Sequence, residues 1–108
     1  MKIINIHTQI SVDDLLSFLR QNLNPCFQQY KPGEIQFSVE NIEGNIEIAE
    51  PENYEGFLYR IQLKGEELHI TRSEHYTDDV NSLALESVLN ELFGELAGEK
   101  GVSLVLEG

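Results

Sequence analysis

The sequence contains one cysteine, no tryptophan and three prolines among its 108 residues. The lone thiol, Cys26, cannot form an internal disulfide, and this fits a reducing compartment. No apolar run approaches the ~18 residues that a membrane-spanning helix needs. The first residues also lack the pattern of a signal peptide. We therefore expect a cytoplasmic protein that makes no membrane contact.

Basic residues are scarce. Seven Lys and Arg stand against 19 Asp and Glu, which gives a formal net charge of −12. Such a chain is repelled by nucleic acid and by anionic lipid, so we expect no direct nucleic-acid binding. Hydrophobic residues make up 41% of the chain, which is too many for a disordered protein. The length predicts a single domain over residues 1–108.

Motifs of catalysis and cofactor binding are also missing. The sequence has no G-x-S-x-G, no phosphate-binding loop and no dinucleotide fingerprint, so we expect no cofactor and no enzymatic activity. No basic residue lies within four positions of Cys26, which predicts a half-buried structural thiol rather than a nucleophile. His7 is interpreted as a hydrogen-bonded histidine without a catalytic role.

Two segments have the periodicity of helices that bury one face. Ser11 is a predicted N-cap, with Asp13 and Asp14 in the first turn. This helix is predicted to end at Asn24, because the residue before Pro25 avoids the helical region. Its predicted buried residues are Val12, Leu15, Leu16, Leu19 and Leu23.

The second helix is predicted to open at residues 77–79 and to end at Gly98 or Gly101. A glycine inside its buried stripe, Gly94, predicts a close packing contact. The stripe itself comprises Leu85, Val88, Leu89, Leu92, Phe93 and Leu96.

Six segments are predicted strands, giving the order β-α-β-β-β-β-α-β. This order predicts an α+β two-layer sandwich, with a mainly antiparallel sheet and both helices on one face. The last strand is apolar enough that we place it inside the sheet rather than at its edge. The segments are 2–7, 34–40, 45–49, 57–63, 67–73 and 102–106. The open face of the sheet is predicted to carry Gln36, Ser38, Arg60, Gln62, His69 and Thr71.

The negative charge is concentrated in two blocks, residues 34–59 and 73–99. Each block has seven carboxylates and no Lys or Arg, so together they carry −14 and the rest of the chain 7 − 5 = +2. If the blocks adjoin, they form a surface that attracts a basic protein. The alternative is that they are ordinary solvated faces, which keep the domain from aggregating.

The leading hypothesis is a small binding module for a basic protein partner, of the inhibitor or immunity, nucleic-acid-mimic or chaperone type. The segment 50–56 is predicted to be an exposed loop that presents a tyrosine, a frequent interface anchor. The candidate partner-binding residues are Glu47, Glu50, Glu52, Tyr54, Glu55, Glu74, Asp78 and Asp79.

Two alternatives remain open. One is a small metal-dependent enzyme or metal-binding protein, because His69, Glu74, His75, Asp78 and Asp79 include metal-ligand residue types. The other is a homodimer with no role specific to its surface charge. Phe18 and Leu58 are candidate contacts for such a dimer, since both lie off the predicted buried faces.

Overall fold

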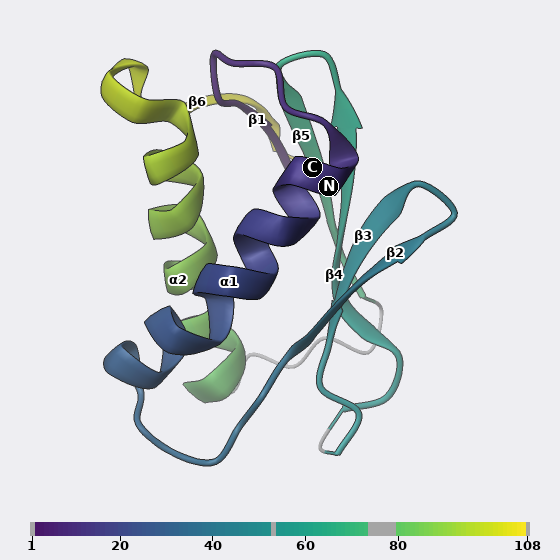
Figure 1. Ribbon diagram of the computed structural model, residues 1–108, viewed down its shortest axis with the longest axis vertical. Helices are drawn as coiled ribbons and strands as arrows, with labels where there is room; N and C mark the ends of the chain where they lie inside the picture. Colours follow the sequence, from purple (N-terminus) through teal and green to yellow (C-terminus); the bar gives the residue numbers. More distant parts are fainter. Residues whose placement is uncertain (1, 53, 74–79, 108) are drawn as a thin grey trace.

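Two helices cover one face of a six-stranded antiparallel sheet in the computed structural model (Figure 1). The structure describes residues 2–52, 54–73 and 80–107. The elements are β1 (Lys2–Asn5), α1 (Val12–Tyr30), β2 (Ser38–Ile42), β3 (Asn45–Ala49), β4 (Phe57–Lys64), β5 (Glu67–Arg72), α2 (Val80–Ala97), a 3₁₀ turn (Gly98–Lys100) and β6 (Ser103–Glu107). This confirms the α+β class and the predicted order of elements.

The start of α1 is as predicted. The Ser11 hydroxyl accepts a hydrogen bond from the backbone N–H of Asp14 at 3.1 Å, and Asp13 and Asp14 occupy the first turn. The predicted end at Asn24 is wrong, because the helix continues through Pro25 to Tyr30. A proline inside a helix removes one hydrogen bond and costs about 3 kcal/mol.

Long-range packing explains why α1 continues past Pro25. Phe27 is buried one turn beyond Leu23, and its ring packs edge-on against Phe37, with ring centroids 4.8 Å apart. Burying a side chain of this size contributes about 1.5–3 kcal/mol. The Asn24 side chain also holds both backbone groups of Phe37, donating to its carbonyl at 3.0 Å and accepting from its N–H at 2.8 Å. These contacts together offset much of the cost of the proline.

The same contacts explain why β2 starts later than predicted, at Ser38 instead of residue 34. The alternation over residues 34–37 correctly places Phe37 inward, but this stretch pairs with no strand among the described residues. Its backbone is bound by side-chain amides of α1 instead, including Gln28, which donates to the Ile35 carbonyl at 2.9 Å. Alternating burial therefore arises here without a β-ladder.

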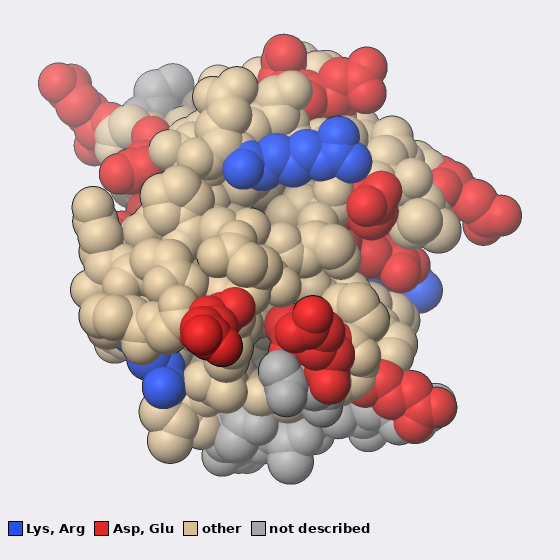
Figure 2. All heavy atoms as spheres, turned by 60° about the horizontal axis from the view of Figure 1, so that its bottom comes forward, with Lys and Arg blue, Asp and Glu red and all other residues tan. Residues whose placement is uncertain are grey.

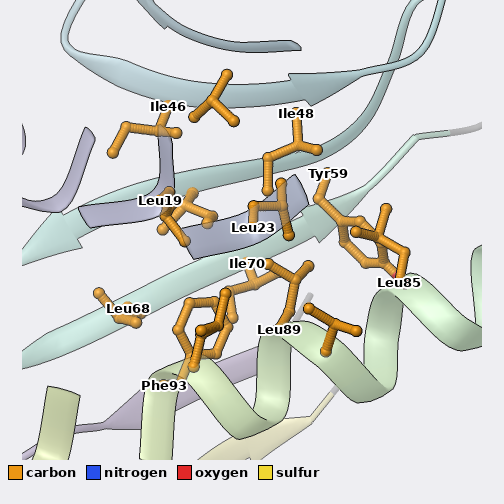
Figure 3. Close-up of a cluster of buried hydrophobic side chains, with 14 of the residues drawn as sticks. Leu19, Leu23, Ile46, Ile48, Tyr59, Leu68, Ile70, Leu85, Leu89 and Phe93 are labelled. Carbon is orange, nitrogen blue, oxygen red and sulfur yellow. The ribbon is translucent and has the colours of Figure 1, made fainter. Parts of the chain in front are cut away.

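The core lies between the layers, and both helices and the five strands β1 to β5 contribute to it. Figure 3 shows part of this core. The predicted α2 stripe is buried except for Leu96, which is half-buried. Gly98 follows the helix with a φ of 62°, as a helix-ending glycine does. The predicted close contact at Gly94 is wrong, because no described residue outside its own stretch of helix lies within 4 Å of a Cβ built there. The predicted opening of α2 at 77–79 lies outside the described residues.

The sheet order is β2-β3-β4-β5-β1-β6, so β6 is an edge strand and its predicted place inside the sheet is wrong. An apolar run indicates that both faces of a strand are covered, but it does not determine how many strands flank it. The strand beside β6 is β1, which lies inside the sheet and pairs with both β5 and β6.

Candidate functional site

The two acidic blocks lie in different layers of the described structure. Glu40, Glu43 and Glu47 belong to the β2–β3 hairpin in the sheet, whereas Glu91 and Glu95 belong to α2. Figure 2 shows acidic side chains in separate groups on one face, with a Lys or Arg side chain among them. The candidate residues Glu74, Asp78 and Asp79 lie outside the described residues. On that face the described acidic side chains therefore form no single patch.

Several carboxylates of the blocks form ion pairs with basic residues from other segments. Glu40 and Glu47 are cross-strand neighbours, and each has its own arginine. Arg20 lies 3.5 Å from Glu40, while Arg60 lies 2.9 Å from Glu47 and 4.4 Å above the ring of Phe57. This pairing relieves the repulsion between two opposed glutamates. Glu47, a candidate partner-binding residue, is thus already engaged within the chain.

The segment 50–56 is only partly the exposed loop that we predicted. Pro51, Glu52 and Glu55 are exposed, but Glu50 is only 1% exposed. The Glu50 side chain accepts the N–H of Glu52 at 2.9 Å, and its carbonyl accepts the N–H of Tyr54, also at 2.9 Å. Tyr54 is half-buried and packs against the core. Glu50 and Tyr54 therefore shape the loop instead of presenting their side chains to a partner. Glu50 is buried, and the core covers part of Tyr54.

The open face of the sheet carries both signs of charge. Arg60 and Thr71 are neighbours across β4 and β5, as are Gln62 and His69, in agreement with the predicted face. Gln36 lies before β2 and is not in the sheet. The ring nitrogen of His69 lies 3.1 Å from a carboxylate oxygen of Glu67. This face therefore has alternating polar groups instead of a continuous acidic surface.

The metal hypothesis finds no cluster in the part of the chain that the structure describes. No group of three or more His, Cys, Asp or Glu residues is placed to hold a metal ion there. His69 is the one member of the predicted set that is described, and Glu67 is its partner. Glu74, His75, Asp78 and Asp79 lie outside the described residues.

Cys26 and His7 have the structural surroundings that we predicted. Cys26 is half-buried, and its thiol donates to Glu91 at 3.7 Å. Burial, followed by the Glu91 carboxylate, raises the pKa of Cys26, and this disfavours the nucleophilic thiolate. His7 has a positive φ of 60°, and its ring nitrogen lies 2.9 Å from the Ser103 hydroxyl. His7 thereby links the end of β1 to β6.

An apolar hollow lies where α1 ends and α2 begins. We use this name for the concavity of about 350 Å³ lined by Tyr30, Lys31, Val80, Leu83, Ala84 and Ser87. Five large apolar side chains are exposed among the described residues, and the three most exposed line this hollow: Val80 at 69%, Tyr30 at 58% and Leu83 at 50%. Sequence reasoning missed it. The available signal was that Tyr30 and Leu83 lie off the buried stripes.

A second concavity lies between the sheet and α2. This sheet–helix cavity has a volume of about 330 Å³ and is lined by Lys2, Tyr59, Ile70, Thr71, Arg72, Ser73, Glu86, Leu89, Asn90 and Phe93. Three strands, β1, β4 and β5, supply its sheet side. Sequence reasoning missed it as well, because its lining comes from four segments that are distant along the chain.

Comparison with protein-family models, curated proteins and solved structures finds no match to this chain. Among the described residues, neither helix combines the length and the apolar character that crossing a bilayer requires. The case for a function therefore depends on the two concavities and on the charge.

Proposed function

We propose that this chain is an acidic cytoplasmic binding module that docks a basic protein partner at the apolar hollow. The observation that carries the proposal is that the three most exposed large apolar side chains of the described structure line one concavity. Apolar side chains that gather on a surface are typical of protein-binding sites, whereas scattered ones are not. The lone Cys26, a free thiol, fits the proposed compartment.

The chemistry of the lining suits an anchored interface. Tyr30 supplies a rigid amphipathic ring, a residue type enriched at binding hot spots. Val80 and Leu83 add aliphatic surface, and together the three side chains flank a space in which an apolar side chain of the partner fits. Lys31 also lines the hollow, so we expect the partner's apolar anchor, and not its basic groups, to enter.

The net charge of −12 supports a basic partner. A strongly charged protein raises the rate of encounter with an oppositely charged one over distances of about 10 Å at 0.1 M salt. Many exposed carboxylates form no ion pair within the described residues and contribute to this field: Glu34, Glu43, Glu52, Glu55, Glu66, Glu91, Glu95 and Glu99. Two of them, Glu52 and Glu55, belong to the predicted partner-binding set.

A second copy of the chain is a weaker candidate for the occupant. Two molecules with a net charge of −12 each repel one another. The contacts that the sequence suggested for a homodimer are also unsuitable, since Leu58 is 2% exposed and Phe18 packs against the core. Inhibition, nucleic-acid mimicry and chaperoning all involve a basic protein client, and the proposal covers these three modes.

The test compares capture of partners by a tagged wild-type chain and by two single variants. Leu83→Ser removes an apolar side chain of the hollow, while Val102→Ser is a matched control because Val102 is a similarly exposed apolar residue (45%) after the end of α2. We expect the wild type and Val102→Ser to capture the same basic protein, and Leu83→Ser to lose it. Capture should also weaken at 300 mM salt, where the Debye length is about 6 Å.

Two results would contradict the proposal. One is a partner whose capture is equal for Leu83→Ser and the wild type, because binding would then occur elsewhere. The other is the absence of any captured protein at both salt concentrations. Light scattering at two concentrations tests the other candidate, a second copy of the chain. A wild-type dimer that Leu83→Ser disrupts would mean that a second copy fills the hollow.

A further inference from the structure

We infer that side chains of α1 guard the outer edge of β2 and keep a strand of a second copy of the chain from pairing with it. β2 lies at one end of the described sheet, with β3 as its neighbour. An edge strand presents backbone N–H and C=O groups on its outer side, and these groups can pair with a strand of another molecule. The inference does not depend on the proposed function, because this edge and the apolar hollow share no residue.

The hairpin between β2 and β3 determines which backbone groups of β2 face outward. Its two loop residues have positive φ values of 53° and 88°, as in the tight turns that close two-residue hairpins. The residues that flank such a turn, Ile42 and Asn45, form a hydrogen-bonded pair, and bonded and non-bonded pairs alternate along an antiparallel ladder. The backbone groups of Val39 and Asn41 therefore face the outer edge of the sheet.

Side chains of α1 already occupy the carbonyls along this edge. Three of them donate at 2.8, 3.0 and 2.9 Å, respectively: Arg20 to Val39, Asn24 to Phe37 and Gln28 to Ile35. The donors are four positions apart on the helix, and the acceptors are two positions apart. Four residues of a helix rise about 6.0 Å and two residues of a strand about 6.6 Å, so the two repeats match. α1 thus takes the place of a further strand along this edge.

Arg20 is the donor that matters most for pairing between molecules. Its acceptor, Val39, lies within β2, whereas the acceptors of the other two donors precede the strand. The Arg20 guanidinium also lies 3.5 Å from a carboxylate oxygen of Glu40, so an ion pair helps to hold it beside the strand. Arg20 therefore covers an outward carbonyl of β2 and places a charge at the edge, and charged side chains discourage edge-to-edge pairing.

A second copy of β2 is the strand that fits this edge when Arg20 is removed. Two copies can pair antiparallel about a two-fold axis, with Val39 of one copy opposite Asn41 of the other. The two pairs related by the axis would form four hydrogen bonds between the strands. Two of these bonds need the Val39 carbonyl, one on each copy, which Arg20 occupies in the folded chain. Removing Arg20 makes both available.

The test compares the self-association of the wild type, Arg20→Met and Arg60→Met by sedimentation velocity. Salt at about 300 mM shortens the Debye length to about 6 Å and screens the repulsion between acidic copies. Arg20→Met keeps an apolar stem but removes the donor. Arg60→Met is the matched control, because Arg60 also pairs with a glutamate but lies on the interior strand β4. We expect Arg20→Met to self-associate at least about tenfold more strongly than the other two, since two hydrogen bonds per dimer become available.

Amide hydrogen exchange followed by NMR locates the contact. In Arg20→Met, exchange of the Val39 and Asn41 amides should slow as the protein concentration rises. Exchange of the Glu40 amide, which faces β3, should not depend on concentration. Thermal melts check that the variants fold. If Arg20→Met does not fold, Arg20→Ala takes its place, because alanine also lacks the donor and has the highest helix propensity.

Four results would overturn the inference. The first is that Arg20→Met is as monomeric as the wild type. The second is that Arg60→Met self-associates equally strongly, since the loss of a positive charge would then be the cause. The third is self-association of Arg20→Met without slower exchange at Val39 and Asn41, because another surface would then be paired. The fourth is self-association that a further Leu83→Ser substitution abolishes, which would place the contact at the apolar hollow.

Discussion

The sheet–helix cavity and the apolar hollow both border α2, yet they differ in almost every physical property. Buried core residues such as Phe93 and Leu89 form the wall of the cavity, and two basic side chains line it. The hollow is flanked by exposed apolar residues near the ends of two helices. A space continuous with the core suits a small ligand that is largely enclosed, whereas a shallow apolar surface suits a macromolecule. This contrast is the reason why we propose the hollow, and not the cavity, as the docking surface for a protein.

The largest expected effect is on the stability of the protein, and it differs between a residue that lines the cavity and one that lines the hollow. Phe93→Ala should lower the free energy of unfolding by about 3–5 kcal/mol, because Phe93 is 1% exposed and belongs to the core. Leu83→Ala should change it by only about 0.5 kcal/mol, because Leu83 is 50% exposed. Urea unfolding at equilibrium measures both. Equal losses for the two variants would mean that the hollow is part of the packed core and would contradict its assignment as a binding surface.

The second effect concerns the α1 side of the hollow, which exists only because the helix continues past Pro25. Asn24→Ala removes both hydrogen bonds to the backbone of Phe37 and should cost about 1–3 kcal/mol. The matched control is Asn22→Ala, which removes one bond to the Phe18 carbonyl within the same helix and should cost about 1 kcal/mol or less. Urea unfolding again gives the values. If Asn22→Ala lowered the free energy of unfolding as much as Asn24→Ala does, the hydrogen bonds from Asn24 to Phe37 would not be what stabilises the C-terminal part of α1.

Local signals in the sequence predicted most of the fold but neither concavity. Ser11 and the acidic residues after it predicted where α1 begins, because an N-cap acts over one turn. The end of α1 was missed because the rule for Pro25 is local, while Phe27 and Phe37 contribute through a contact ten residues apart. The hollow and the cavity were missed for the same reason. Each depends on side chains from distant segments, which periodicity does not bring together.

Charge was the least reliable guide to the site. The sequence showed two acidic blocks, but it did not show that Arg20, Arg60 and Lys2 each pair with one of their glutamates. It also did not show that Glu50 is buried and holds its own loop. Counting carboxylates predicts the sign of the overall field, which acts at long range. The exposure of each group depends on packing, which the count does not contain.

The third effect concerns the acidic residues of α2 beside Cys26, and the reactivity of this thiol reports their charge. Burial, with the carboxylates of Glu91 and Glu95, raises its pKa, so less thiolate should be present at a given pH than for an ordinary thiol. The pH profile of iodoacetamide alkylation should therefore lie at higher pH for the folded protein than for the protein in urea. Glu91→Gln should move the profile of the folded protein toward lower pH and speed alkylation several-fold at pH 8. A Glu67→Gln control, which changes a residue on β5, should leave the profile unchanged. A profile that Glu91→Gln does not move would mean that the Glu91 carboxylate does not contribute to the raised pKa of Cys26.

The smallest expected effect concerns the ion pair between Lys2 and Glu86, two residues that line the sheet–helix cavity. A double-mutant cycle on Lys2 and Glu86 should give a coupling energy of about 0–1 kcal/mol, because the pair is 3.7 Å apart and partly exposed, at 28% and 35%. The cycle on Arg60 and Glu47, at 2.9 Å with two N–H donors on one oxygen, should give the larger value of the two. The comparison shows how firmly Glu86 holds the Lys2 ammonium beside the cavity. A coupling above about 2 kcal/mol at Lys2 would mean that the ammonium is committed to Glu86.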